Sequence, residues 1–176
     1  MVANLSANKK GWEDRWEEFS SWAVKGQQYK KTLLDLVDED TLAFKAIMNA
    51  FGLPKSTDAE KKARTTAIQD ATKYAIEVPL KVMETAFNSM EVLKAMAENG
   101  LEASVSDAGV GALCARSAVL GAFLNVKINL ATLKDNAYIK SVTDKGMEIR
   151  NKAIKSEEEI LKICEKRHPN GWSPAG

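Results

Sequence analysis

The sequence predicts an all-α protein, and three observations carry that prediction. Apolar residues recur with the 3.6-residue spacing of a helix along most of the 176 residues, no segment alternates as a strand would, and the chain has only four prolines. We expect one domain, an antiparallel bundle of long helices joined by short loops. The predicted helices leave the bundle incomplete. We therefore expect that a second copy of the chain completes the core by dimerisation, or that further sequence belongs before Met1.

The first helical pattern runs from about Trp12 to Phe51, where Gly52 and Pro54 end it. Its apolar residues fall on one side of a helix, which we expect to face the core. This expected inner face comprises Trp12, Trp16, Phe19, Ala23, Leu33, Val37, Phe44, Ile47 and Phe51.

The second pattern begins with the sequence T-x-x-E at positions 57–60, which is the signature of a capping box. It continues to Asn99, where the pair Asn99-Gly100 is a typical helix stop. Pro79 interrupts its middle. Because proline has no N–H, we expect a kink there and a carbonyl oxygen of Ala75 without its helical partner.

Two further helices follow. Ser104 with Asp107 repeats a capping signal and opens a helix rich in alanine and glycine. The last helix runs from about Asp135 to Lys166, so the domain spans residues 1–166 and residues 167–176 are expected to form a flexible tail.

Composition argues against several functions. The net charge of +1 does not suggest nucleic-acid binding through a basic face. Two cysteines and one histidine cannot supply the four ligands of a structural zinc site, so we expect no metal. The opening residues lack the order of a secretory signal, and no run of 18 uncharged apolar residues occurs. We expect a cytoplasmic protein that binds no membrane.

The alanine- and glycine-rich helix carries a stripe of small residues with polar residues at its ends. On a helical wheel, Gly111, Ala118, Asn125 and Asn129 lie within about 60° of Asp107. One interpretation is a tight seam against a neighbouring helix or a second subunit, with Asp107 serving as a helix cap. The other is a ligand-binding face. Asp107 and Asn125 lie about 27 Å apart along a straight helix and cannot contact the same reacting atom.

Asp40 falls inside the apolar pattern of the first helix, near Leu36, Phe44 and Ile47. An aspartate buried there is costly unless it is paired or used. Desolvation would favour its protonated form near neutral pH, which suits a proton shuttle. The alternative is a structural aspartate that binds a backbone group or a lysine.

Four cations are candidates for an anionic ligand. Lys55 and Arg64 would lie together at one end of the first two helices, and Arg116 and Lys127 lie opposite the small-residue stripe. The alternative for all four is that they are solvated side chains or interface cations.

Several stretches of this sequence closely resemble a known family. They are "MVANLS" at the start, "DEDTLAFKAIMNAFGLPKSTDAEKKAR", "AIEVPLKVMETA" around Pro79, and "SVSDAGVGALCARSAVLGAFLNVKIN". The chain resembles, over about residues 1–165, the cyclodeaminase domain of formimidoyltransferase-cyclodeaminase and the related methenyltetrahydrofolate cyclohydrolases.

This resemblance implies an all-α folate enzyme that forms a homodimer or larger homo-oligomer. Its reaction would close 5-formimidoyltetrahydrofolate to 5,10-methenyltetrahydrofolate and release ammonia, with a tetrahydrofolate derivative as substrate. The related enzymes open methenyltetrahydrofolate with water. The alternatives are such a cyclohydrolase and a folate-binding or dimerisation module without catalysis. A formimidoyltransferase domain is a further expected partner.

The resemblance also implies site residues. Asp40 matches the acidic position of D-x-x-A-F, and we expect it to shuttle the proton while Asp107 orients the pterin or the attacking nitrogen. Ser106 and Gly109 match the S-D-A-G motif. Asn125 and Asn129 match N-V-x-I-N, and Lys55 and Arg64 are candidate contacts of the folate glutamate.

The sequence departs from the family at two places. Family members usually carry a helix preceded by a P-x-P-G-G-G-S segment before "MVANL", and we expect that helix and its glycine-rich loop, a ligand contact in the family, to be missing from this chain. The loop before the third long helix reads "GLEAS" here instead of a G-N-P-N-S type sequence.

Overall fold

A computed structural model describes residues 1–167, and within that range it contains helices and no strand, as the sequence predicts. Short 3-10 turns lie at Glu13–Arg15 and Glu102–Ser104. The helices are α1 (Val2–Ala7), α2 (Trp16–Phe51), α3 (Asp58–Asn99), α4 (Val105–Leu130) and α5 (Asn136–Arg167).

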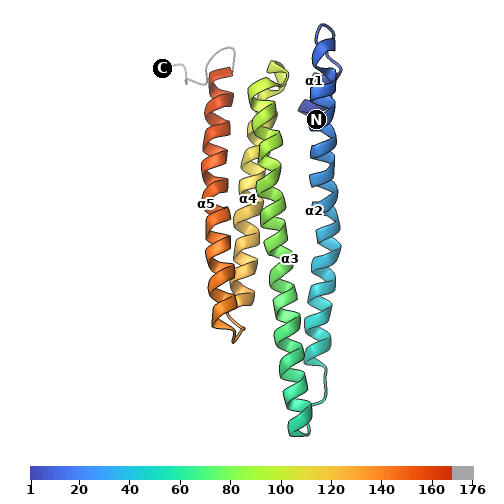
Figure 1. The fold of residues 1–176 in the computed structure, drawn as a ribbon, viewed down its shortest axis with the longest axis vertical. Helices are drawn as coiled ribbons and strands as arrows, with labels where there is room; N and C mark the ends of the chain where they lie inside the picture. Colours follow the sequence, from blue (N-terminus) through green and yellow to red (C-terminus); the bar gives the residue numbers. More distant parts are fainter. Residues whose placement is uncertain (168–176) are drawn as a thin grey trace.

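The long helices run antiparallel in chain order, and α2 and α3 form a hairpin that extends past the ends of α4 and α5 (Figure 1). α3 packs against both α2 and α4, and α5 packs against α4 and α3. The short helix α1 lies beside the start of α2, at the end opposite the α2–α3 loop (Figure 1). The end of the hairpin nearest that loop therefore consists of two helices alone.

The predicted start of α3 is confirmed. The Thr57 side chain accepts a hydrogen bond from the Glu60 N–H at 3.2 Å, and the Glu60 carboxylate accepts one from the Thr57 N–H at 2.9 Å. Both bonds satisfy backbone donors that a helix start leaves without partners.

The carbonyl oxygen left by Pro79 has a partner from another helix. The Asn129 side-chain amide of α4 donates a hydrogen bond to the Ala75 carbonyl oxygen at 3.2 Å. Since Pro79 lacks the N–H that would normally reach Ala75, Asn129 replaces a bond within α3 by one between helices. This contact ties α4 to the middle of α3.

α4 packs closely between α3 and α5 because its glycines lack side chains. A Cβ at Gly109 would lie 3.4 Å from the Cys164 sulfur of α5, and a Cβ at Gly111 would lie 2.5 Å from Leu93 of α3. The stretch Glu102–Leu130 is long and apolar enough to cross a membrane by length and composition alone. In this structure the stretch packs between α3 and α5.

Two expectations about helix ends are wrong. Ser104 precedes α4, but its side chain makes no capping hydrogen bond; its backbone N–H instead bonds to the Leu101 carbonyl oxygen at 3.0 Å in a tight turn. Arg167, expected in the tail, belongs to α5 and donates hydrogen bonds of 2.7 and 2.9 Å to the carbonyl oxygens of Ala97 and Gly100. The rest of the expected tail, 168–176, lies outside the described residues.

The predicted inner face of α2 is wrong in the half near the α2–α3 loop. Leu36, Ala43 and Ala50 are buried there, while Val37 and Phe44 are more than 60% exposed. Val37 and Phe44 share one side of α2, as the helical wheel predicts. Only α3 covers this part of α2, however, and it covers the neighbouring side (Figure 1). An apolar surface is therefore left uncovered.

Candidate functional site

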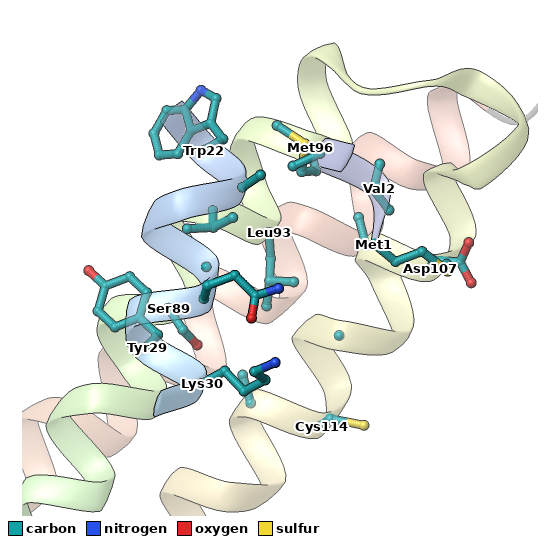
Figure 2. A pocket seen from close by; sticks show the side chains of 18 of the residues that line it. Met1, Val2, Trp22, Tyr29, Lys30, Ser89, Leu93, Met96, Asp107 and Cys114 are labelled. Carbon is teal, nitrogen blue, oxygen red and sulfur yellow. The ribbon is translucent and has the colours of Figure 1, made fainter. Parts of the chain in front are cut away.

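A cavity of about 660 Å³ lies where α1, α2, α3 and α4 meet, near the α1 end of the bundle (Figure 2). Met1 and Val2, at the start of α1, form one end, and Leu93 and Met96 of α3 form the back wall. Volume and apolar walls of this kind are typical of small-molecule sites.

The small-residue stripe of α4 explains why there is space here. Gly111, Ala115 and Ala118 line the cavity on the α4 side, and Ala23 and Gly26 line it on the α2 side. Larger side chains at these positions would fill the gap between the two helices. The stripe forms a tight seam at Gly111, where a Cβ would lie 2.5 Å from Leu93 of α3. The ligand-binding interpretation stays a prediction, and the cavity lies on the same face of α4.

Two of the described residues that line the cavity have charged side chains, and the two charges have opposite signs. Asp107 projects from the first turn of α4 near Met1, and Lys30 projects from α2 further along (Figure 2). Within residues 1–167, neither side chain has a hydrogen-bond or ion-pair partner. Both are exposed, so neither charge needs a partner for folding.

Tyr29 belongs to the cavity wall and is fixed by a charged network. Its hydroxyl donates a hydrogen bond to the Glu91 carboxylate, and the Lys25 ammonium lies 2.7 Å from the same carboxylate. The hydrogen bond to Glu91, with burial adding to it, raises the pKa of Tyr29 to about 12. The Lys25 ammonium and the Tyr29 hydroxyl in turn hold the pKa of Glu91 below its ordinary value. The network keeps Tyr29 protonated and in place.

Comparison with known proteins gives the chain a family. The family model described as formiminotransferase-cyclodeaminase matches residues 1–148. The chain belongs to the formiminotransferase-cyclodeaminase family. It is 37% identical over 138 residues to a methenyltetrahydrofolate cyclohydrolase of Methylorubrum extorquens, covering 78% of this chain and 66% of that protein.

Other members of the family extend the comparison. The chain is 32% identical over 167 residues to the formimidoyltransferase-cyclodeaminase of Gallus gallus, covering 95% of this chain but 31% of that protein. A solved formiminotetrahydrofolate cyclodeaminase of Thermotoga maritima aligns with a TM-score of 0.81 and 26% identity, covering 94% of this chain and 79% of the other. The chain thus spans less than two thirds of the two proteins matched by sequence.

The burial expected for Asp40 is wrong. Asp40 is exposed on the half of α2 that only α3 covers, and it does not line the described cavity. The desolvation on which its proton-shuttle role depended is therefore absent from the single chain. Asp40 lies beside the uncovered apolar surface of α2, next to Val37 and Phe44 on the helix.

The predicted cations Lys55 and Arg64 lie near the α2–α3 loop, at the opposite end of the molecule from α1 (Figure 1). Lys55 is exposed. The Arg64 guanidinium donates hydrogen bonds of 3.3 and 3.2 Å to the Phe51 carbonyl oxygen, and so satisfies the end of α2. Neither residue lines the cavity.

The motif residues of α4 divide between packing and surface. Gly109 is buried against α5, and Asn129 is engaged with Ala75. Ser106 and Asn125 are exposed, and neither lines the cavity. Of the sequence-predicted residues, the structure brings only Asp107 to it.

The remaining candidate cations are engaged elsewhere. Arg116 lies 3.7 Å from the buried Glu157 carboxylate of α5, and the Lys127 ammonium lies over the Phe123 ring at 4.6 Å. No group of three or more His, Cys, Asp or Glu side chains within residues 1–167 could hold a metal ion.

The sequence reasoning missed Lys30, Tyr29 and Ser89 as cavity residues. A usable signal was present, because Ala23, Gly26 and Lys30 recur at helical spacing and place a cation on a small-residue face of α2. Two helices that both present small side chains to each other leave space between them, so the small-residue faces of α2 and α4 together predict a cavity.

Proposed function

We propose that this chain catalyses the ring closure of 5-formimidoyltetrahydrofolate to 5,10-methenyltetrahydrofolate with release of ammonia. The observation that carries the proposal is the position of Asp107. Asp107 carries the one side-chain carboxylate among the described residues that line the cavity. The chain that contains it belongs to the formiminotransferase-cyclodeaminase family.

The chemistry requires one positioned acid–base group and correct orientation. N10 of the folate attacks the formimidoyl carbon and loses its proton, and the departing amine gains one. We assign this proton transfer to Asp107, whose carboxylate can take the N10 proton and return one to the amine. The apolar walls formed by Leu93 and Met96 would orient the ring system and exclude water from it.

The test is turnover by the full chain, followed through the absorbance of the methenyl product. We expect Asp107→Asn to lower kcat by about 100-fold or more, the usual scale for general acid–base catalysis, with the helical circular dichroism spectrum unchanged. Asp40→Asn is the matched control and should keep kcat within about twofold. Loss of turnover in Asp40→Asn alone would return the role to Asp40, as the sequence predicted.

A second candidate reaction is favoured by the match to the Methylorubrum extorquens cyclohydrolase over 78% of this chain. In that reaction the same carboxylate would activate water against methenyltetrahydrofolate. Offering both substrates to the same preparation distinguishes the two activities. Binding of either folate without product would support a binding module instead.

We further propose that the chain assembles as a homodimer through α4 and the uncovered part of α2. Val110, Leu113, Leu124 and Ile128 are 43–70% exposed along one side of α4. Exposed apolar surfaces of this kind mark interfaces, and two-fold homodimers are the commonest assembly. Sedimentation equilibrium should show a dimer that Leu124→Lys dissociates and the control Met147→Lys on α5 does not. A monomeric parent chain would contradict the proposal.

We propose that a formimidoyltransferase, fused to this chain or separate from it, supplies the substrate of this reaction. We also propose that this protein is located in the cytoplasm. Purification of the chain together with a transferase activity would test the first of these proposals.

A further inference from the structure

Lys30 differs from the lysines beside it on α2. The Lys25 ammonium lies 2.7 Å from Glu91, and the Lys31 ammonium lies 2.6 Å from Asp35. Lys30 has no acidic partner within residues 1–167, and its side chain extends across the cavity toward α4 (Figure 2). A cation held above an apolar cavity without a protein counter-charge presents its field to whatever binds there.

The two charges of the cavity are separated along its length. The lining residues of α4 run from Asp107 to Ala118, which corresponds to a slot about 16 Å long at 1.5 Å per residue. Asp107 lies at the α1 end, and Lys30 lies further along, nearer the level of Cys114 (Figure 2). The apolar side chains between them strengthen electrostatic contacts at either end.

A tetrahydrofolate has the matching order of groups. Its pterin carries N–H donors at one end, an aromatic ring follows, and a glutamate with two carboxylates forms the other end. A carboxylate end placed against Asp107 would be repelled, while N10–H, between the pterin and the aromatic ring, would find there the acceptor that the proposed proton transfer needs. The charges of the cavity therefore favour one direction of binding.

We propose that Lys30 binds a glutamate carboxylate of the folate, so that the ligand lies along the cavity with its pterin toward Asp107. This inference rests on the proposed function and names the orientation of the substrate in that same site. It gives the glutamate contact to the part of α2 that lines the cavity, and not to Lys55 and Arg64 near the α2–α3 loop.

The experiment compares Lys30→Gln with the parent chain on two ligands. One is 5-formimidoyltetrahydrofolate, and the other is the corresponding tetrahydropteroyl amide, in which an uncharged amide replaces the glutamate. We expect the substitution to raise KM and Kd for the folate by about fivefold, the scale of one partly exposed charged contact, with kcat unchanged. The pteroyl amide should bind both proteins equally. Lys30→Arg should restore most of the affinity, and Lys45→Gln, an equal loss of charge elsewhere on α2, should have no effect.

Two results would overturn the assignment of Lys30. One is that folate affinity is the same in Lys30→Gln and the parent, and the other is that the substitution weakens the folate and the pteroyl amide equally. Failure of the parent chain to bind either compound would instead refute the proposed function itself, and the Lys30 assignment with it.

Discussion

Asn129→Ala removes the hydrogen bond that reaches the Ala75 carbonyl oxygen beside Pro79. Ala75 is 7% exposed, and Pro79 cannot donate to this oxygen. A buried acceptor left without its partner costs about 1–3 kcal/mol, and the long 3.2 Å bond places the expected loss of unfolding free energy near the lower end, at about 1–2 kcal/mol.

A second substitution tests the reason for that cost. Pro79→Ala restores a backbone N–H at the position that donates to Ala75 in a regular helix. In that background, Asn129→Ala should cost only about 0.5 kcal/mol, which gives a coupling energy of about 1 kcal/mol between the two sites. Urea unfolding followed by far-ultraviolet circular dichroism measures all four proteins at one protomer concentration, because assembly would make stability depend on concentration.

Additive costs in this cycle would refute the reasoning, since Asn129 would then not replace the missing bond of Pro79. The folate affinity of Asn129→Ala provides an independent check. We expect it to be unchanged, because Asn129 does not line the cavity. Weaker folate binding with unchanged stability would restore the substrate-binding role that the sequence predicted.

Two further predictions concern packing and pH. Gly146→Ala should lower the unfolding free energy by about 1–3 kcal/mol in the same urea experiment, because the new methyl group would collide with the buried Phe123 ring. The control is Gly26→Ala, whose methyl group would meet only Val92 at 3.8 Å and should leave stability unchanged or raise it. The pKa of Tyr29, raised to about 12 in the folded chain, contributes stability that is complete below pH 10 and is lost as the pH rises toward 12. Tyr29→Phe should abolish both this loss of stability and the step of highest pH in the tyrosinate absorbance titration. The prediction is contradicted if the unfolding free energy falls equally steeply with pH above 10 in the parent and in Tyr29→Phe.

The four long helices, α2 to α5, could be predicted because residues close in sequence determine where each helix begins and ends. The capping box at 57–60, the Asn99-Gly100 stop and the apolar spacing each depend on residues close in sequence. Asp40 shows the limit of the same reasoning. A helical wheel tells which residues share a face, but not that α2 extends past the helices that would cover it.

The site was only partly predictable, because its contacts join distant segments. The freed carbonyl of Ala75 and the candidate residue Asn129 were both recognised, but their pairing spans 54 positions and depends on how α4 lies against α3. Lys30 sits among other lysines on α2, and only the fold separates it from neighbours that are paired with carboxylates. Asp107 was found because a helix start carries its own signal.

The most direct test of the account is the rate at which Cys114 is alkylated in the presence of folate, read by mass spectrometry of the intact chain. Cys114 is exposed and lines the cavity, while burial raises the pKa of the Cys164 thiol and keeps that thiol unreactive. We expect a folate at saturating concentration, verified by equilibrium dialysis, to slow alkylation of Cys114 by about tenfold or more, in proportion to occupancy. Alkylation of Cys114 at the full rate while folate is bound would place the folate outside this cavity.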